Sequence, residues 1–91
     1  MAKFLAIHPL PFPVTIKDAN LFGRKAKANV TVDAYWVKSW AQLNEEGKIV
    51  KLFCEWNATD IDAVRKVMAK MPELPCEGVY PLMIVDSEDF R

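Results

Sequence analysis

The sequence predicts an α+β domain in which two helices cover one face of a four-stranded antiparallel sheet. Two segments have the capping residues and apolar spacing of helices, and four others are short apolar or aromatic runs. They follow one another in the order strand, helix, strand, strand, helix, strand. The chain has 91 residues, which is enough for one domain, and we assign residues 1–91 to it.

The first strand is expected at residues 3–8, KFLAIH. The prolines of PLPFP should end it, because proline cannot donate a hydrogen bond to a sheet. The first helix is expected at residues 16–28, where Thr15 and Asp18 have the spacing of a capping box. Its apolar face comprises Ile16, Ala19, Phe22 and Ala26.

A hairpin follows the first helix. Strands are expected at residues 33–43 and 48–56, joined by residues 44–47, in which Gly47 can supply the positive φ of a turn.

The second helix begins after Thr59, which has Asp62 three residues on. Its apolar stripe comprises Ile61, Val64, Val67, Met68 and Met71. The last strand is expected at residues 79–85, where Pro81 indicates an edge position or a bulge.

This order of elements is that of the ferredoxin-like βαββαβ fold. Its sheet has a second face that no helix covers, and a large bare apolar face is not tolerated in a soluble monomer. The hydrophobic content of 52% is slightly high for a soluble domain of this size. We therefore expect a homodimer that packs these open faces together, with a higher oligomer also possible.

Composition excludes several other classes. Twelve basic and twelve acidic residues cancel and form no basic stripe, so nucleic acid is not expected as a partner. The first residues, MAKFLAIHPLPFPV, are too short and too broken by proline for a signal peptide or a membrane span. Cys54 and Cys76 lack CxxC spacing, which favours free thiols and a cytoplasmic location.

The hairpin loop also predicts which residues face each other. One face pairs Leu43 with Lys48, Ala41 with Val50, Ser39 with Leu52 and Val37 with Cys54. The other pairs Trp40 with Lys51, Lys38 with Phe53 and Trp36 with Glu55. The side chains of the first set are smaller, and we expect them under the helices. We expect the second set on the open face.

In the first strand, Leu5 and Ile7 are expected on the helix side, and Phe4, Ala6 and His8 on the open side. His8, the single histidine, would then share the open face with Lys38 and Glu55. These three residues are the candidate catalytic groups.

Two kinds of site could be built on the open face. A divalent metal would take His8 and Glu55, with Tyr35, Cys54 or Cys76 as further donors in the chain. A small-molecule pocket would be lined by Phe4, Trp36, Trp40 and Phe53. The simpler interpretation is a hydrogen-bonded surface histidine, a cross-strand ion pair and tryptophans that form a dimer interface.

Several short stretches occur in the order seen in a known family. They are FLAIH, then Trp36-Val37-Lys38-Ser39-Trp40, then Phe53-Cys54 leading into Ala58-Thr59-Asp60, and then Leu74-Pro75. The chain thereby resembles a family of small bacterial and archaeal proteins of largely unknown function that is described as nickel-binding. The resemblance implies a ferredoxin-like fold that dimerises as an α+β barrel. It also implies that His8, with Cys54 as a second candidate ligand, binds a divalent metal such as nickel.

A second resemblance is to the wider dimeric α+β barrel superfamily, through VMAKMPELP and the closing strand. That superfamily includes muconolactone isomerase and small heme or quinol monooxygenases. Three hypotheses stay open: a cytoplasmic homodimer that binds a metal or small ligand, a cofactor-free isomerase-like or monooxygenase-like enzyme, and a structural or interaction module.

Overall fold

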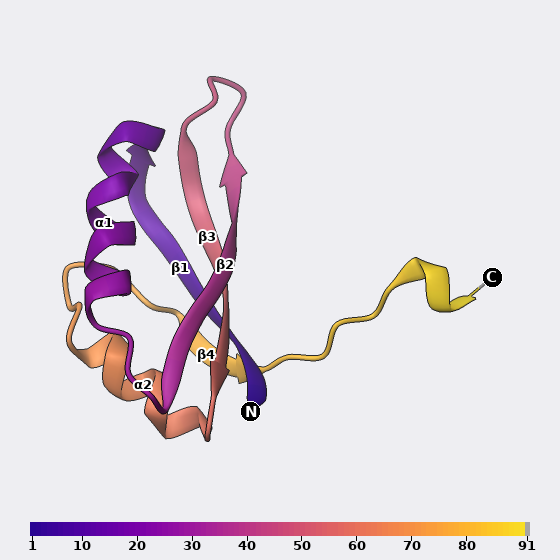
Figure 1. Cartoon of the computed structure of the whole chain (residues 1–91). Coiled ribbons are helices and arrows are strands. Elements are labelled where there is room, and N and C mark those ends of the chain that lie inside the picture. Colours follow the sequence, from indigo (N-terminus) through magenta and orange to yellow (C-terminus); the bar gives the residue numbers. More distant parts are fainter. Residues whose placement is uncertain (91) are drawn as a thin grey trace.

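A computed structural model describes residues 1–90 of the chain. Strands β1 (Ala2–Val14), β2 (Ala34–Leu43), β3 (Ile49–Ala58) and β4 (Gly78–Pro81) form one antiparallel sheet in the order β2-β3-β1-β4. Helices α1 (Ile16–Ala28) and α2 (Ile61–Ala69) lie on the same face, and a short 3-10 turn, η1 (Ser87–Phe90), comes after β4 (Figure 1). This β-α-β-β-α-β order confirms the ferredoxin-like α+β fold.

The first helix has the predicted ends, and the second begins one residue later than the capping box suggested. In α1 the backbone N–H of Asp18 donates to the hydroxyl of Thr15 over 3.1 Å. In α2 the N-cap is Asp60 and not Thr59, because the Asp60 carboxylate accepts from the N–H of Ala63 over 2.8 Å. A carboxylate at the N-cap also favours the positive end of the helix dipole.

Strand β1 runs through the prolines that were expected to end it. It pairs with β3 from Ala2 to Pro9 and again at Val14, with an irregularity between them. The short strand β4 pairs only with residues Phe4 to Ile7 of β1. The second half of β1 is therefore an edge on that side, where a missing N–H donor costs no sheet hydrogen bond.

Strand β4 is shorter than predicted and ends at Pro81 rather than at residue 85. After it, the N–H of Leu82 donates to the carbonyl of Lys3 over 3.0 Å, and the chain then leaves the sheet. We call residues 82–90 the projecting segment. In Figure 1 it extends away from the sheet on the side opposite the helices.

The hairpin turn is confirmed, whereas the pairing it implied is shifted. Gly47 has a φ of 79°, and the N–H of Asn44 donates to the carbonyl of Lys48 over 2.8 Å. The observed pairs include Ala41 with Leu52, Trp40 with Phe53, Ser39 with Cys54 and Lys38 with Glu55. This register is two residues from the predicted one, a shift that leaves the faces unchanged because the side-chain period is two.

A bulge between Trp36 and Lys38 changes the face of one tryptophan. Trp36 pairs with Trp56 and lies under the helices, not on the open face as predicted, and Val37 is an exposed extra residue rather than a buried one. One inserted residue reverses the side-chain alternation on either side of it. Lys38 and Trp40 lie on the helix-free face, as predicted.

The face assignment of β1 was wrong. Phe4, Ala6 and His8 are buried on the helix side, opposite Trp56, Cys54 and Leu52 of β3. Leu5 and Ile7 are half-buried on the helix-free face. Because both sets in this strand are apolar, their alternation carried no signal for the buried side. The pairing with β3 decides it.

The core lies between the sheet and the two helices. Its largest fully buried side chain is Trp56, packed in one cluster with Val64 and Val67 of α2 and with Phe4 and Ala6 of β1. Across residues 1–90, no helix is both long and apolar enough to cross a membrane.

Candidate functional site

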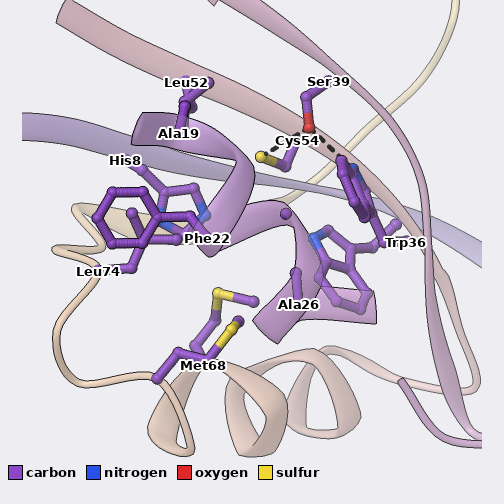
Figure 2. Close-up of a pocket in the computed structure, with 13 residues that line it drawn as sticks. His8, Ala19, Phe22, Ala26, Trp36, Ser39, Leu52, Cys54, Met68 and Leu74 are labelled. Carbon is purple, nitrogen blue, oxygen red and sulfur yellow. Dashed lines mark hydrogen bonds between the residues drawn. The ribbon is translucent and has the colours of Figure 1, made fainter. Parts of the chain in front are cut away.

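A cavity of about 100 Å³ lies between α1 and the helix-covered face of the sheet (Figure 2). Its wall is mostly apolar and comprises Ala19, Phe22, Gly23, Ala26, Trp36, Leu52, Met68, Met71 and Leu74. The side chains of its wall that carry a nitrogen, hydroxyl or thiol group are His8, Trp36, Ser39, Cys54 and Trp56. An apolar enclosure with a few polar groups has the composition of a small-molecule site.

His8 lies at one end of the cavity with Phe22 and Leu74, as Figure 2 shows. Its Nδ1 lies 2.9 Å from the carbonyl oxygen of Pro75, which can only accept, so Nδ1 carries the proton and donates. The neutral ring then has Nε2 as a hydrogen-bond acceptor. Burial lowers the pKa of His8, while the bond to Pro75 acts in the opposite direction, so the ring is neutral at pH 7.

Trp36, Ser39 and Cys54 form a hydrogen-bonded chain at the other end (Figure 2). The indole N–H of Trp36 donates to the Ser39 hydroxyl over 2.8 Å, and that hydroxyl donates to the Cys54 sulfur over 3.0 Å. Positions three apart in a regular strand face opposite sides, so this bond between residues 36 and 39 depends on the bulge.

The Cys54 thiol lies under the helices, as the sequence predicted. Burial raises its pKa, and the hydrogen bond from Ser39 acts in the opposite direction. The group is therefore a protonated thiol near neutral pH and not an activated nucleophile. Cys76, the other free cysteine, is exposed.

Trp56 lines the cavity and has an unsatisfied hydrogen-bond donor. Its side chain is 1% exposed, and its Nε1–H has no hydrogen-bond partner among residues 1–90. A buried polar group without a partner costs about 1–3 kcal/mol. An unsatisfied buried donor beside a cavity requires a physical explanation.

The structure separates the residues predicted to form a site on the open face. His8 lies in the cavity, whereas Glu55 and Lys38 lie opposite each other on the helix-free face. Glu55 is 1% exposed and pairs with Lys3 over 2.6 Å, not with Lys38. The prediction that His8 and Glu55 share a face is wrong because the face of β1 is reversed.

The predicted pocket is divided in the same way. Trp36 lines the helix-side cavity, Phe4 belongs to the buried core, and Trp40 pairs with Phe53 on the helix-free face. Within one chain these four side chains do not enclose a common space, because the sheet separates them.

The donors needed for a metal do not come together within one chain. Over the described part of the chain, no three His, Cys, Asp or Glu side chains form a group that could hold an ion. His8 and Cys54 line the same cavity, and Glu55 lies on the other face of the sheet. This donor set does not fit a nickel centre, and metal binding stays a prediction.

The sequence analysis did not assign Trp56 to a site, although this residue lines the cavity and its indole N–H has no partner within residues 1–90. A signal for it was present, because residues two apart in a strand share a face. Once Cys54 is placed under the helices, Trp56 belongs there too. The roles of Phe22 and Met68 in one cavity had no such signal, because they come from different helices.

The unfolding free energy is expected to decrease as the pH falls through the titration range of His8. Its pKa in the folded protein lies below the ordinary value of 6.5, so at mildly acidic pH the unfolded chain binds a proton that the folded chain does not. The stabilising contribution is complete above 6.5 and is lost as the pH falls below it toward the folded value. Urea unfolding at about pH 7.5 and about pH 5.5 measures the difference.

The control is His8→Gln, which keeps a polar side chain but does not titrate. Its unfolding free energy should change less between the two pH values than that of the unmodified protein. Glu73, whose pKa is lowered from 4.5 chiefly by its hydrogen bond with Lys25, titrates below this range. An equal pH dependence in both proteins would contradict the assignment to His8.

No protein-family model, curated protein or solved structure matches this chain. The resemblance to the nickel-binding family therefore stays a prediction from short motifs.

Proposed function

We propose that the protein binds a small neutral organic molecule in the cavity between α1 and the sheet. The observation that carries the proposal is the unpartnered indole N–H of Trp56, a residue that lines this largely apolar space. Such a donor is stabilised by a guest that has a hydrogen-bond acceptor.

The size of the cavity limits the guest. An engineered apolar cavity of about 150 Å³ accommodates benzene, which has six non-hydrogen atoms, so a cavity of about 100 Å³ suits a molecule of about four non-hydrogen atoms. The apolar wall favours a short branched chain.

The charge state of the wall supports a neutral guest. His8 is neutral because its pKa is lowered, and Cys54 is a protonated thiol because its pKa is raised. No ionised side chain lines the cavity, and a charge buried without a partner is costly. A hydroxyl group suits the site because it can accept from Trp56 or donate to Nε2 of His8.

2-Propanol and isobutane provide a direct test, because each has four non-hydrogen atoms and they differ in the hydroxyl group. We expect 2-propanol to bind about tenfold more tightly, a ratio that corresponds to about 1.4 kcal/mol. The resonance of the Trp56 indole N–H in a proton–nitrogen NMR spectrum should shift with 2-propanol as the hydrogen bond forms. Trp56→Phe should remove the preference for 2-propanol while the apolar part still binds.

A pair of α1 variants tests the location of the site. Ala19 lines the cavity and Ala28 is exposed on the same helix. Ala19→Leu should fill the space and abolish binding of both compounds, whereas Ala28→Leu should leave it unchanged. Equal binding of 2-propanol and isobutane, or 2-propanol binding that survives Ala19→Leu, would refute the proposal.

A further inference from the structure

A second hollow, which we call the outer groove, lies along one flank of α1 and is open to water. Its wall is formed by residues of α1 and by Trp36 of β2. Three residues, Ala19, Gly23 and Trp36, line both this groove and the cavity. The two spaces therefore adjoin each other at the Trp36 indole, which lies at the end of the cavity away from His8 (Figure 2).

Gly23 leaves the boundary between the two spaces without a side chain. Glycine inside a helix lowers its stability relative to alanine, and residue 23 lies well within α1. A Cβ atom at this position would meet Cη2 of Trp36 at 3.8 Å, which is an ordinary van der Waals contact. A longer side chain would extend into the space where the cavity and the outer groove adjoin.

The outer groove has a positive charge that this chain does not balance. Arg24 and Lys27 line it and are exposed, and neither forms an ion pair within residues 1–90. None of the residues that line the groove is acidic. The cavity, by contrast, is lined by no ionised side chain. An apolar cavity beside a cationic groove is complementary to a molecule that has one neutral end and one anionic end.

We propose that the ligand of the cavity is a short-chain hydroxy acid, whose hydroxyl end fills the cavity and whose carboxylate lies in the outer groove beside Arg24 and Lys27. This inference rests on the proposed function, because the buried end is the neutral guest described there. A cavity of about 100 Å³ holds about four non-hydrogen atoms, so the carboxylate lies outside it. In the groove the carboxylate stays in contact with water, and the Arg24 guanidinium can donate two parallel hydrogen bonds to it.

A pair of probes tests the role of the charge. The acid is 3-hydroxybutanoate, which is 2-propanol extended by one carboxylate group, and 3-hydroxybutanamide has the same shape without the charge. In NMR titrations at neutral pH and low salt, we expect the acid to bind about tenfold more tightly than the amide. The acid should also shift the Trp56 indole N–H resonance, as 2-propanol does. High salt should reduce the preference for the acid, because it screens exposed charges.

Two double variants locate the charge that the acid recognises. Arg24→Gln/Lys27→Gln should remove the preference for the acid and leave the affinity for the amide unchanged. The matched control is Arg65→Gln/Lys66→Gln on α2, which removes the same two positive charges from exposed positions that do not line the outer groove. It should keep the preference. A preference that survives in the first variant, or that the control loses as well, overturns the inference.

Binding of 2-propanol separates this inference from the proposed function, because that probe carries no acid group. Equal binding of the acid and the amide, together with binding of 2-propanol, overturns the hydroxy acid and leaves the cavity site in place. Acid binding that leaves the Trp56 indole resonance unchanged also overturns the inference, because the carboxylate is then held without the cavity. If none of the three compounds binds, the proposed function fails and the inference fails with it.

Discussion

Trp56→Ala is expected to remove a large part of the stability of this domain. Trp56 is the largest fully buried side chain, and truncating a buried tryptophan costs about 3–5 kcal/mol. A small domain has a total unfolding free energy of about 5–15 kcal/mol. Urea unfolding followed by far-ultraviolet circular dichroism measures the change without relying on tryptophan fluorescence.

Trp56→Phe is the informative partner of that variant. Phenylalanine retains an aromatic ring in the core and removes the N–H that has no partner within residues 1–90. The smaller side chain reduces stability because it leaves unfilled volume in the core. Removing the unsatisfied N–H offsets part of this loss, so we expect a destabilisation below about 2 kcal/mol. A loss equal to that of Trp56→Ala would contradict this interpretation and indicate that the indole N–H has a partner.

Lys3→Met is expected to destabilise the protein by about 3 kcal/mol at neutral pH. Glu55 lies on the helix-free face but is 1% exposed, and its Oε2 accepts from Lys3 over 2.6 Å. Its Oε1 has no partner in the described chain, so Lys3 is the group that balances its charge. Removing the ammonium leaves a buried carboxylate uncompensated, although partial exposure of Lys3 admits some water. Urea unfolding again gives the size of the loss.

Two further variants distinguish the loss of the Lys3–Glu55 ion pair from a general effect of replacing a lysine. Lys48→Met removes an exposed ion pair with Glu46, whose charged atoms are 4.0 Å apart, and should change stability by less than about 0.5 kcal/mol. Lys3→Met/Glu55→Leu removes both charges and should recover most of the loss. If the double variant is no more stable than Lys3→Met, the cost does not come from a stranded carboxylate.

Local signals in the sequence predicted the elements that depend on near neighbours. The N-cap at Thr15 acts through Asp18, three residues away, and α1 has the expected bounds. Gly47 forms its turn within four residues of Asn44. From such elements the order of strands and helices follows, and with it the fold class.

The positions of the site residues depend on contacts between segments that are far apart in the sequence. Both faces of β1 are apolar, so only pairing with β3 decides that His8 lies under the helices and apart from Glu55. The bulge at Val37 moves Trp36 beneath α1, and the short β4 lets β1 continue through its prolines. The capping residues and the turn can be recognised in the sequence because each is satisfied within a few residues. The cavity and the burial of Glu55 are set by pairings across the sheet, where shifting one strand by one residue exchanges its two faces.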